Sequence, residues 1–266
     1  MVNAMKQLRL LDALELPKRE EKPRQTGVCS VLDPGLPTEL FQDMIESHGQ
    51  WIDWVKFGWG TALVTKDIQK KLTILKHHNI EAYFGGTLFE KCVQQNVVDD
   101  YYRMLDDVDI QWLEISDGTL SIARESKLNY IRQASEHFNV LSEVGFKDPE
   151  RSEAFYPSEW IEAIQLELAA GAYKCVTEAR ESGSSGICRS NGELRFGLIH
   201  EMINSDLNID SLVFETPNKM LQKFFIEQIG ANVNLANISL FDVVGLETLR
   251  LGLRSDTFFV AHKGAV

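Results

Sequence analysis

The stretch IQWLEIS, residues 110–116, is an apolar run that carries a polar or charged residue near its end, and seven other runs share this form. The eight runs are VCSVLD (28–33), IDWVKFG (52–58), IEAYFGGT (80–87), IQWLEIS (110–116), NVLSEVG (139–145), AYKCVTEA (172–179), SLVFET (211–216) and ANVNLANI (231–238). Helix-like stretches separate most neighbouring runs. Eight β-then-α units are the number that closes a (β/α)8 barrel, or TIM barrel, whose chemistry lies at the carboxyl ends of its strands. The pattern therefore predicts this fold, with polar side chains gathered at one rim.

The domain organisation follows from the same reading. Helices are expected over 37–48, 65–78, 88–105, 120–136, 157–170, 191–204, 217–229 and 243–252. An extra amphipathic N-terminal helix is expected over 3–16, followed by a charged linker. We therefore expect residues 1–22 to form the N-terminal helix and linker, and residues 23–266 to form one barrel domain. A doubly wound sheet is the structural alternative, but the sequence after the first run lacks the glycine-rich turn typical of that fold.

Composition excludes several classes of function. The chain has 266 residues and a net charge of −12, from 27 basic and 39 acidic side chains, so nucleic acid is not an expected partner. No apolar run approaches the roughly 20 residues that a membrane helix needs. The N-terminus does not resemble a secretory signal. Four widely spaced cysteines suit reduced thiols, and we expect a cytoplasmic protein, with a homo-oligomer as its assembly.

Acidic residues at the strand ends are the main candidates for a metal site. In a closed barrel they would converge with Lys56, and each alone could simply pair with a neighbouring base. Together the acids outnumber the bases near them, and a divalent cation with oxygen ligands, Mg²⁺ above all, would neutralise the excess. The predicted ligands are Asp33, Glu114, Glu178 and Glu215, with Glu143 beside them as a catalytic candidate.

Glycine-rich and basic loops at the strand ends are candidates for binding an anionic substrate. Lys56 precedes Gly-Trp-Gly, and the segment 180–186 offers an arginine, hydroxyls and flexible backbone. Tight turns or solvated loops are the alternative explanation for both segments. The predicted substrate-binding residues are Arg180, Ser182, Gly183, Gly85, Gly86 and Asn234. No nucleophile elbow is present, and no histidine lies at a strand end, so covalent catalysis and zinc are not expected.

The same segments carry a family resemblance, in order and with no large gap, from about residue 27 to 257. The strings are LDPGLP, DWVKFGWGT, GGTLFE, EISDGT, LSEVG, EARESG, FETPNK, VNLANI and LETLRLGLRSDT. They resemble those of the phosphosulfolactate synthase family, which implies a (β/α)8 barrel that adds sulfite to phosphoenolpyruvate with Mg²⁺. The resemblance implies that Lys147 is the general acid, that Lys56 and Arg180 bind anions, and that the pathway is coenzyme M biosynthesis.

The chain departs from the family pattern in three loops. After the seventh run, Thr216-Pro217-Asn218-Lys219 stands where Ala-Pro-Gln-Lys is expected. Pro34 and Phe146 stand where basic residues are expected, which leaves a different nucleophile or acceptor open. One alternative is a Mg²⁺-dependent aldolase or lyase acting on another phosphorylated 2-oxo or enol acid, for which Lys174 is a candidate Schiff-base lysine. A non-catalytic, stress-related homologue is the other.

Overall fold

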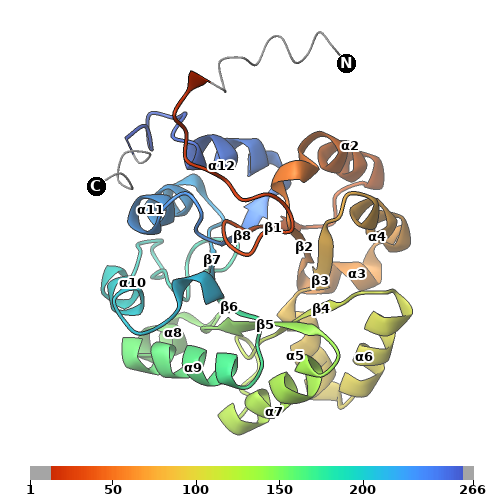
Figure 1. Ribbon diagram of the computed structural model, residues 1–266. Coiled ribbons are helices and arrows are strands. Elements are labelled where there is room, and N and C mark those ends of the chain that lie inside the picture. Colours follow the sequence, from red (N-terminus) through yellow and green to blue (C-terminus); the bar gives the residue numbers. More distant parts are fainter. Residues whose placement is uncertain (1–12, 260–266) are drawn as a thin grey trace.

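Eight parallel strands form a ring at the centre of the molecule, and Figure 1 views this ring nearly end-on. This computed structural model describes residues 13–259. The strands are β1 (Cys29–Asp33), β2 (Trp54–Phe57), β3 (Glu81–Phe84), β4 (Trp112–Ile115), β5 (Asn139–Val144), β6 (Lys174–Thr177), β7 (Leu212–Glu215) and β8 (Leu235–Ser239). Their order is β3-β2-β1-β8-β7-β6-β5-β4, and β3 contacts β4 where the ring closes. The predicted barrel is confirmed.

Helices surround the ring on its outer side (Figure 1). They are α2 (Thr38–His48), α3 (Thr61–Val64), α4 (Ile68–His77), α5 (Gly86–Gln95), α6 (Val98–Asp107), α7 (Arg124–Ser135), α8 (Pro149–Ala154), α9 (Pro157–Ala169), α10 (Phe196–Ile203), α11 (Lys219–Ile229) and α12 (Val243–Arg250). The prediction of one helix over 88–105 was wrong. Asn96 adopts a left-handed conformation, with φ of 57°, and divides this segment into α5 and α6.

Two apolar cores follow from the alternation of side chains along each strand. Side chains that point outward pack with the helices in the larger core, which includes Val31 and Phe57. Side chains that point inward fill the barrel with a second cluster, consisting of Val28, Trp54, Tyr83, Leu141, Val176, Val213 and Ala236. This inner layer fills the barrel just below its carboxyl end. The next inward residues along the strands therefore lie directly above closely packed apolar side chains.

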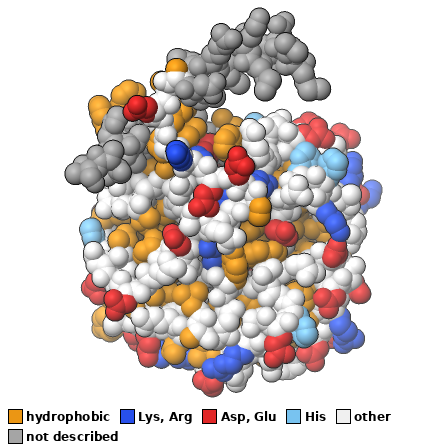
Figure 2. Space-filling view, viewed as in Figure 1, with side chains coloured by type: hydrophobic (Ala, Val, Ile, Leu, Met, Phe, Trp, Pro, Cys, Tyr) orange, Lys and Arg blue, Asp and Glu red, His pale blue; other side chains and the backbone are white. Residues whose placement is uncertain are grey.

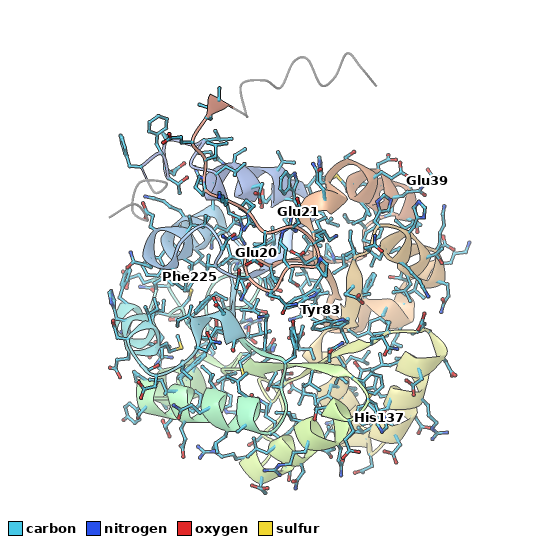
Figure 3. The ribbon with its side chains drawn as sticks, viewed as in Figure 1. Glu20, Glu21, Glu39, Tyr83, His137 and Phe225 are labelled. Atoms are coloured by element: carbon cyan, nitrogen blue, oxygen red, sulfur yellow. The ribbon has the colours of Figure 1, made fainter. Side chains whose placement is uncertain are left out.

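The segment 17–27 crosses the amino-terminal end of the barrel (Figures 1 and 3). Arg19 pairs with Glu247 and donates to the carbonyl oxygen of Gly27, while Arg24 pairs with Asp53 immediately before β2. Figure 3 labels Glu20 on this segment, where its carboxylate accepts hydrogen bonds from residues 25 and 26. The expected linker is therefore packed on the barrel. The expected helix over 3–16 lies almost wholly outside the described residues.

On the face shown in Figure 2, charged side chains are dispersed, and Lys and Arg are scattered among Asp and Glu. Within residues 13–259, no helix has the length and apolar character needed to cross a membrane.

Candidate active site

Lys56 occupies the centre of the barrel mouth, surrounded by three glutamates from other strands. Lys56, Glu143 and Glu215 each lie two positions beyond a residue of the inner apolar cluster. Glu114 lies two positions beyond Trp112, which packs against that cluster, so all four side chains point inward. The Nζ atom of Lys56 lies 2.7 Å from Glu114 Oε1, with Glu143 Oε2 at 3.4 Å and Glu215 Oε1 at 3.3 Å. The four side chains are almost completely buried. The structure thus joins β2, β4, β5 and β7 through one ammonium group.

Lys147 forms the second positive centre of the mouth, from the loop after β5. Its Nζ lies 2.6 Å from both Glu143 Oε1 and Glu178 Oε2. The side chain is 25% exposed, so it remains accessible from the cavity, whereas both glutamates are buried. Gly118 makes room for it, because a Cβ there would lie 2.9 Å from the lysine Nζ. Lys56, Lys147 and the glutamates therefore form one continuous network.

Backbone amides hold the outer oxygens of these glutamates. Gly86 donates to Glu114 Oε2 at 3.2 Å, and Ala179 donates to Glu215 Oε2 at 2.9 Å. The amide of Arg180 donates to Glu178 Oε1 at 2.6 Å. A carboxylate anchored at one oxygen keeps the other oxygen aimed at a lysine, so the loops fix the geometry before any ligand arrives.

Burial and charge set the protonation of the network. Burial would lower the pKa of Lys56 and of Lys147, but their glutamate partners outweigh it and raise both pKa values above the ordinary value for lysine. Burial raises the pKa of Glu114 well above its usual range, against the pull of Lys56. Burial and the charges of Glu143 and Glu215 do the same for the pKa of Glu178.

Glu143 behaves in the opposite way. Burial favours its neutral form, but Lys147 and Lys56 outweigh burial and hold the pKa of Glu143 well below its usual range. Hydrogen bonds with Glu114 and Glu178 act in the same direction. The network therefore contains charged lysines, an ionised central glutamate and two flanking carboxyl groups that tend to keep protons.

A narrow cavity opens onto this network. Its lining includes Lys56, Lys147, Gly85, Gly86 and Arg180. The guanidinium of Arg180 has no ion-pair partner among residues 13–259, which leaves a partly exposed cation at the entrance. The structure brings these five predicted residues together.

Asp33 does not belong to this site, contrary to the sequence-based expectation. Its Oδ2 pairs with Lys71 of α4 at 2.5 Å, and its Oδ1 accepts from the amides of Gly35 and Leu36. Asp33 and Val31 point outward, while Leu32 between them faces the cavity. Its carboxylate therefore holds the loop after β1 against the helix layer.

Asn234, predicted to contact substrate, lies at the opposite end of the barrel. Its Oδ1 accepts from the amide of Val28, and its Nδ2 donates to the carbonyl oxygens of Asp210 and Leu212. Its side chain therefore joins the amino ends of three strands and is not available at the mouth.

Ser182 and Gly183 also lie apart from the network. They line a separate surface cavity beside α10 and α11, and Ser182 Oγ is bonded to Ser184 Oγ at 2.6 Å. The predicted loop thus contributes Arg180 to the mouth but not its serine and glycine.

Lys174 does not provide the Schiff-base lysine that an aldolase alternative would need. It begins β6 at the amino end of the barrel, where its Nζ donates to the carbonyl oxygen of Asp210 at 2.6 Å. This places it on the side of the ring that the segment 17–27 covers.

Two residues of the site escaped the sequence-based prediction. Asn237 lines the cavity, although only Asn234 of that run was chosen. Lys127 of α7 is buried behind β5, where it donates to the carbonyl oxygen of Glu143 at 2.7 Å and pairs with Asp117 and Glu167. A lysine on a helix gives no sequence signal for such a role, whereas an asparagine inside a strand is unusual enough to have been noticed.

The carboxylates at the barrel mouth are compatible with a metal ion that takes few of its ligands from the protein. Among residues 13–259, no three Asp, Glu, His or Cys side chains are arranged to hold a metal together. Mg²⁺, however, commonly takes only one or two carboxylates and completes its shell with water and substrate oxygens. The four glutamates exceed the two lysines that they contact only when Glu114 and Glu178 lose their protons, and in that state a divalent cation at the mouth would suit the charge of the site.

Comparison with known proteins agrees with this architecture. Residues 17–256 match the family described as (2R)-phospho-3-sulfolactate synthase (ComA). Phosphosulfolactate synthase of Bacillus subtilis is 51% identical over 93% of this chain and 98% of its own length. That of Methanothermobacter thermautotrophicus is 39% identical over 91% of this chain and 95% of its own. A more distant relative, Protein HEAT-STRESS-ASSOCIATED 32 of Arabidopsis thaliana, is 27% identical over 87% of this chain and 88% of its own.

Solved structures support the fold alone. The crystal structure of 3-hexulose-6-phosphate synthase aligns with a TM-score of 0.52 at 13% identity, covering 88% of this chain and 96% of its own. The carboxyl transferase domain of Rhizobium etli pyruvate carboxylase aligns with a TM-score of 0.56 at 11% identity, covering 83% of this chain and 41% of that one.

The fold and the site define a (β/α)8-barrel enzyme whose mouth carries a buried network of lysines and glutamates. Within that class, the family match and the identity to its curated members are specific. The chain belongs to the phosphosulfolactate synthase family.

Proposed function

We propose that this protein is a lyase that adds sulfite to phosphoenolpyruvate and forms phosphosulfolactate. The sulfur lone pair of sulfite forms a bond with the methylene carbon C3. The electrons of the C2–C3 double bond move to C2 and the adjacent carboxylate, giving an aci-carboxylate, and a proton is then added at C2. The observation that carries this proposal is the contact of Lys147 with Glu143 and Glu178 at the mouth of a barrel with this family match.

This chemistry needs no side-chain nucleophile, because sulfite itself is the nucleophile. The protein must instead bind anions and stabilise the charge that develops on the substrate carboxylate. Lys56 and Arg180 are suited to this task by their charge and position on the cavity. Together they would hold the phosphorylated acid against the glutamate network.

Lys147 is the proposed general acid. Its raised pKa keeps the amine protonated at neutral pH, so a proton is available when charge develops at C2. An aci-carboxylate carbon is far more basic than an amine, so transfer remains favourable despite that raised pKa. After transfer, the neutral lysine would regain a proton from solvent through the exposed part of its side chain.

Mg²⁺ is the proposed cofactor, with one or two of Glu114, Glu178 and Glu215, the members of the predicted set that lie at the mouth, as its ligands. The bound ion would supply Lewis-acid stabilisation of negative charge on substrate oxygens. Because Glu114 and Glu178 have raised pKa values, a cation that binds them must displace protons. Metal affinity is accordingly expected to increase with pH.

A turnover assay tests the proposal. Phosphoenolpyruvate is incubated with the purified protein, with and without sulfite and with and without Mg²⁺, and its loss is followed by phosphorus NMR. We expect loss only when both additions are present, with a new phosphate monoester as product and no free phosphate. Loss that does not depend on sulfite would favour the alternative enol-acid lyase, and no loss under any condition would contradict the proposal.

A further inference from the structure

Asn237 has an unusual position among the polar residues of the barrel mouth. Its side chain is only 8% exposed, and its Oδ1 is buried without a hydrogen-bond partner among residues 13–259. Buried amide oxygens in folded proteins almost always have a partner. Nine buried side-chain atoms lack one among the described residues, but only those of Glu178 and Asn237 belong to the narrow cavity at the barrel mouth, and Glu178 Oε2 contacts Lys147. The neighbouring carboxylates of Glu114 and Glu215, by contrast, are bonded at both oxygens.

A β-bulge turns this side chain into the barrel. Along the β1–β8 ladder, Cys29 pairs with Leu235 and Val31 pairs with Ile238, so β8 contains one residue more than its partner over this step. Asn237 lies in that step with φ of 56°, a left-handed conformation that asparagine tolerates better than most residues. Ala236 faces inward and Ile238 faces outward, and the bulge adds a second inward residue.

The bulge places Asn237 at the junction of two cavities. One is the narrow cavity over Lys56 and Lys147. The other is lined mainly by apolar and proline side chains, including Pro34 and Leu240. Leu32, Glu181 and Asn237 line both cavities. A molecule that contacts the lysines and extends toward the second cavity must pass this amide.

We propose that Asn237 binds substrate, with its amide donating to an anionic oxygen of the phosphorylated enol acid. The inference rests on the proposed function and adds a residue to it. An amide suits this place because it contacts an anion without adding charge to a network whose charges are already paired. Nδ2, unlike Oδ1, is not fully buried, so the amide can direct this donor toward a ligand in the cavity.

Two substitutions test the role of Asn237 and preserve its backbone conformation. N237G removes the amide and tolerates a positive φ, while N237D keeps the shape and replaces the donor with a carboxylate. Phosphoenolpyruvate is titrated into each purified protein by calorimetry, in the presence of Mg²⁺. We expect the Kd to rise about 10-fold or more in N237G, as for loss of a hydrogen bond to a charged group. N237D should weaken binding further, because its charge repels the ligand.

Asn96 provides the matched control. It is also an asparagine with a left-handed backbone, φ of 57°, but it is exposed at the end of α5 and lines none of the cavities at the mouth. N96G and N96D should bind phosphoenolpyruvate as the wild type does. Circular dichroism establishes that each variant is folded.

The outcomes separate this inference from the proposed function. Unchanged Kd values in folded N237G and N237D, beside normal binding by the wild type, would overturn the role of Asn237 alone. Failure of both variants to fold would make Asn237 a structural residue and would also overturn it. Failure of the wild type to bind phosphoenolpyruvate would overturn the proposed function, and this inference with it.

Discussion

At the scale of single residues, Lys147 has the most important chemical role, because it is the proposed general acid. Replacing it with methionine keeps the length of the side chain but removes the proton, so turnover should fall roughly 10²-fold or more, the usual scale of general acid–base catalysis. Phosphoenolpyruvate binding should change much less. Steady-state kinetics and calorimetry on K147M measure the two effects separately. K223M, at a partly exposed lysine of α11 that pairs with Glu227, is the control and should be unaffected. Near-normal turnover in K147M would leave Lys147 as a structural partner of Glu143.

Glu143 makes a prediction about pH. Its pKa is lower in the folded protein than its ordinary value of 4.5, so the unfolded chain takes up the proton first as pH falls. The stabilisation that this carboxylate provides is therefore present above pH 4.5 and is lost as pH falls below that value. The wild type should exceed E143Q in free energy of unfolding most at pH 7, and the difference should narrow toward pH 3.

Urea unfolding at several pH values measures this difference. E125Q is the control, because Glu125 is exposed and pairs with Arg132 at the surface, where ion pairs contribute little. A difference between wild type and E143Q that stays constant from pH 7 to pH 3 would show that Glu143 is not held ionised by its lysines.

The sequence predicts the glutamates of the mouth well but not every neighbour. Glu143, Glu178 and Glu215 each lie two residues beyond a buried inward residue, and Glu114 lies two residues beyond the half-buried Trp112. Their convergence therefore follows from strand periodicity. Asp33 also ends a run, but it is the residue after the inward-facing Leu32, so its side chain points outward. The sequence does not show which of these two residues of β1 faces the cavity. The inward direction of the Asn237 side chain depends on the β-bulge in β8, which the alternation of residues in the sequence does not reveal.

At the scale of secondary-structure elements, the loop after β6 is held against the strand that it leaves. Gly186, with φ of 63°, lies so close to Glu178 that an added Cβ would overlap the carbonyl oxygen of that glutamate. G186A should therefore displace the loop, lower stability by more than about 1 kcal/mol, and reduce turnover by moving Glu178 away from Lys147. Thermal unfolding and kinetics provide the two measurements.

Gly197 of α10 is the matched control for this prediction. It is exposed, and an added Cβ would meet no atom within 4 Å, so G197A should be neutral or stabilise the helix by up to about 1 kcal/mol. If G186A were as harmless as G197A, close packing of the loop on Glu178 would not be required.

Boundaries of elements were harder to predict than their existence. The sequence indicates a helical segment after β3, but the break at Asn96 depends on one residue adopting a left-handed conformation, which helical periodicity does not reveal. The course of the segment 17–27 is a tertiary property. Its prolines and charges suggest a linker, and only the buried contacts of Arg19 and Arg24 show that it is part of the barrel.

At the scale of the whole molecule, the contacts that stabilise the fold and the proposed catalytic residues lie at opposite ends of the barrel, as is common for this fold. Arg19 closes the amino end through Glu247, Gly27 and the chain before β8, whereas the lysine–glutamate network occupies the carboxyl end. R19A leaves buried acceptors without a donor and should reduce the free energy of unfolding by about 1–3 kcal/mol. Turnover per folded molecule should remain unchanged, because the mouth lies at the far end.

Urea unfolding and active-site titration of R19A test this separation, with the exposed Arg132 as the control site. R132A should change neither quantity appreciably, because its ion pair is at the surface. A loss of turnover in folded R19A would show that the two ends of the barrel are coupled.

The central claim is that sulfite attacks C3 of phosphoenolpyruvate and that the protein delivers a proton to C2. It is tested most directly by running the reaction in deuterium oxide with phosphoenolpyruvate, sulfite and Mg²⁺, and examining the product by proton NMR. We predict a product with one deuterium at C2, two ordinary hydrogens at C3, and a carbon–sulfur bond at C3. Deuterium at C3, the result expected of enolate chemistry, or recovery of unchanged phosphoenolpyruvate would contradict the account.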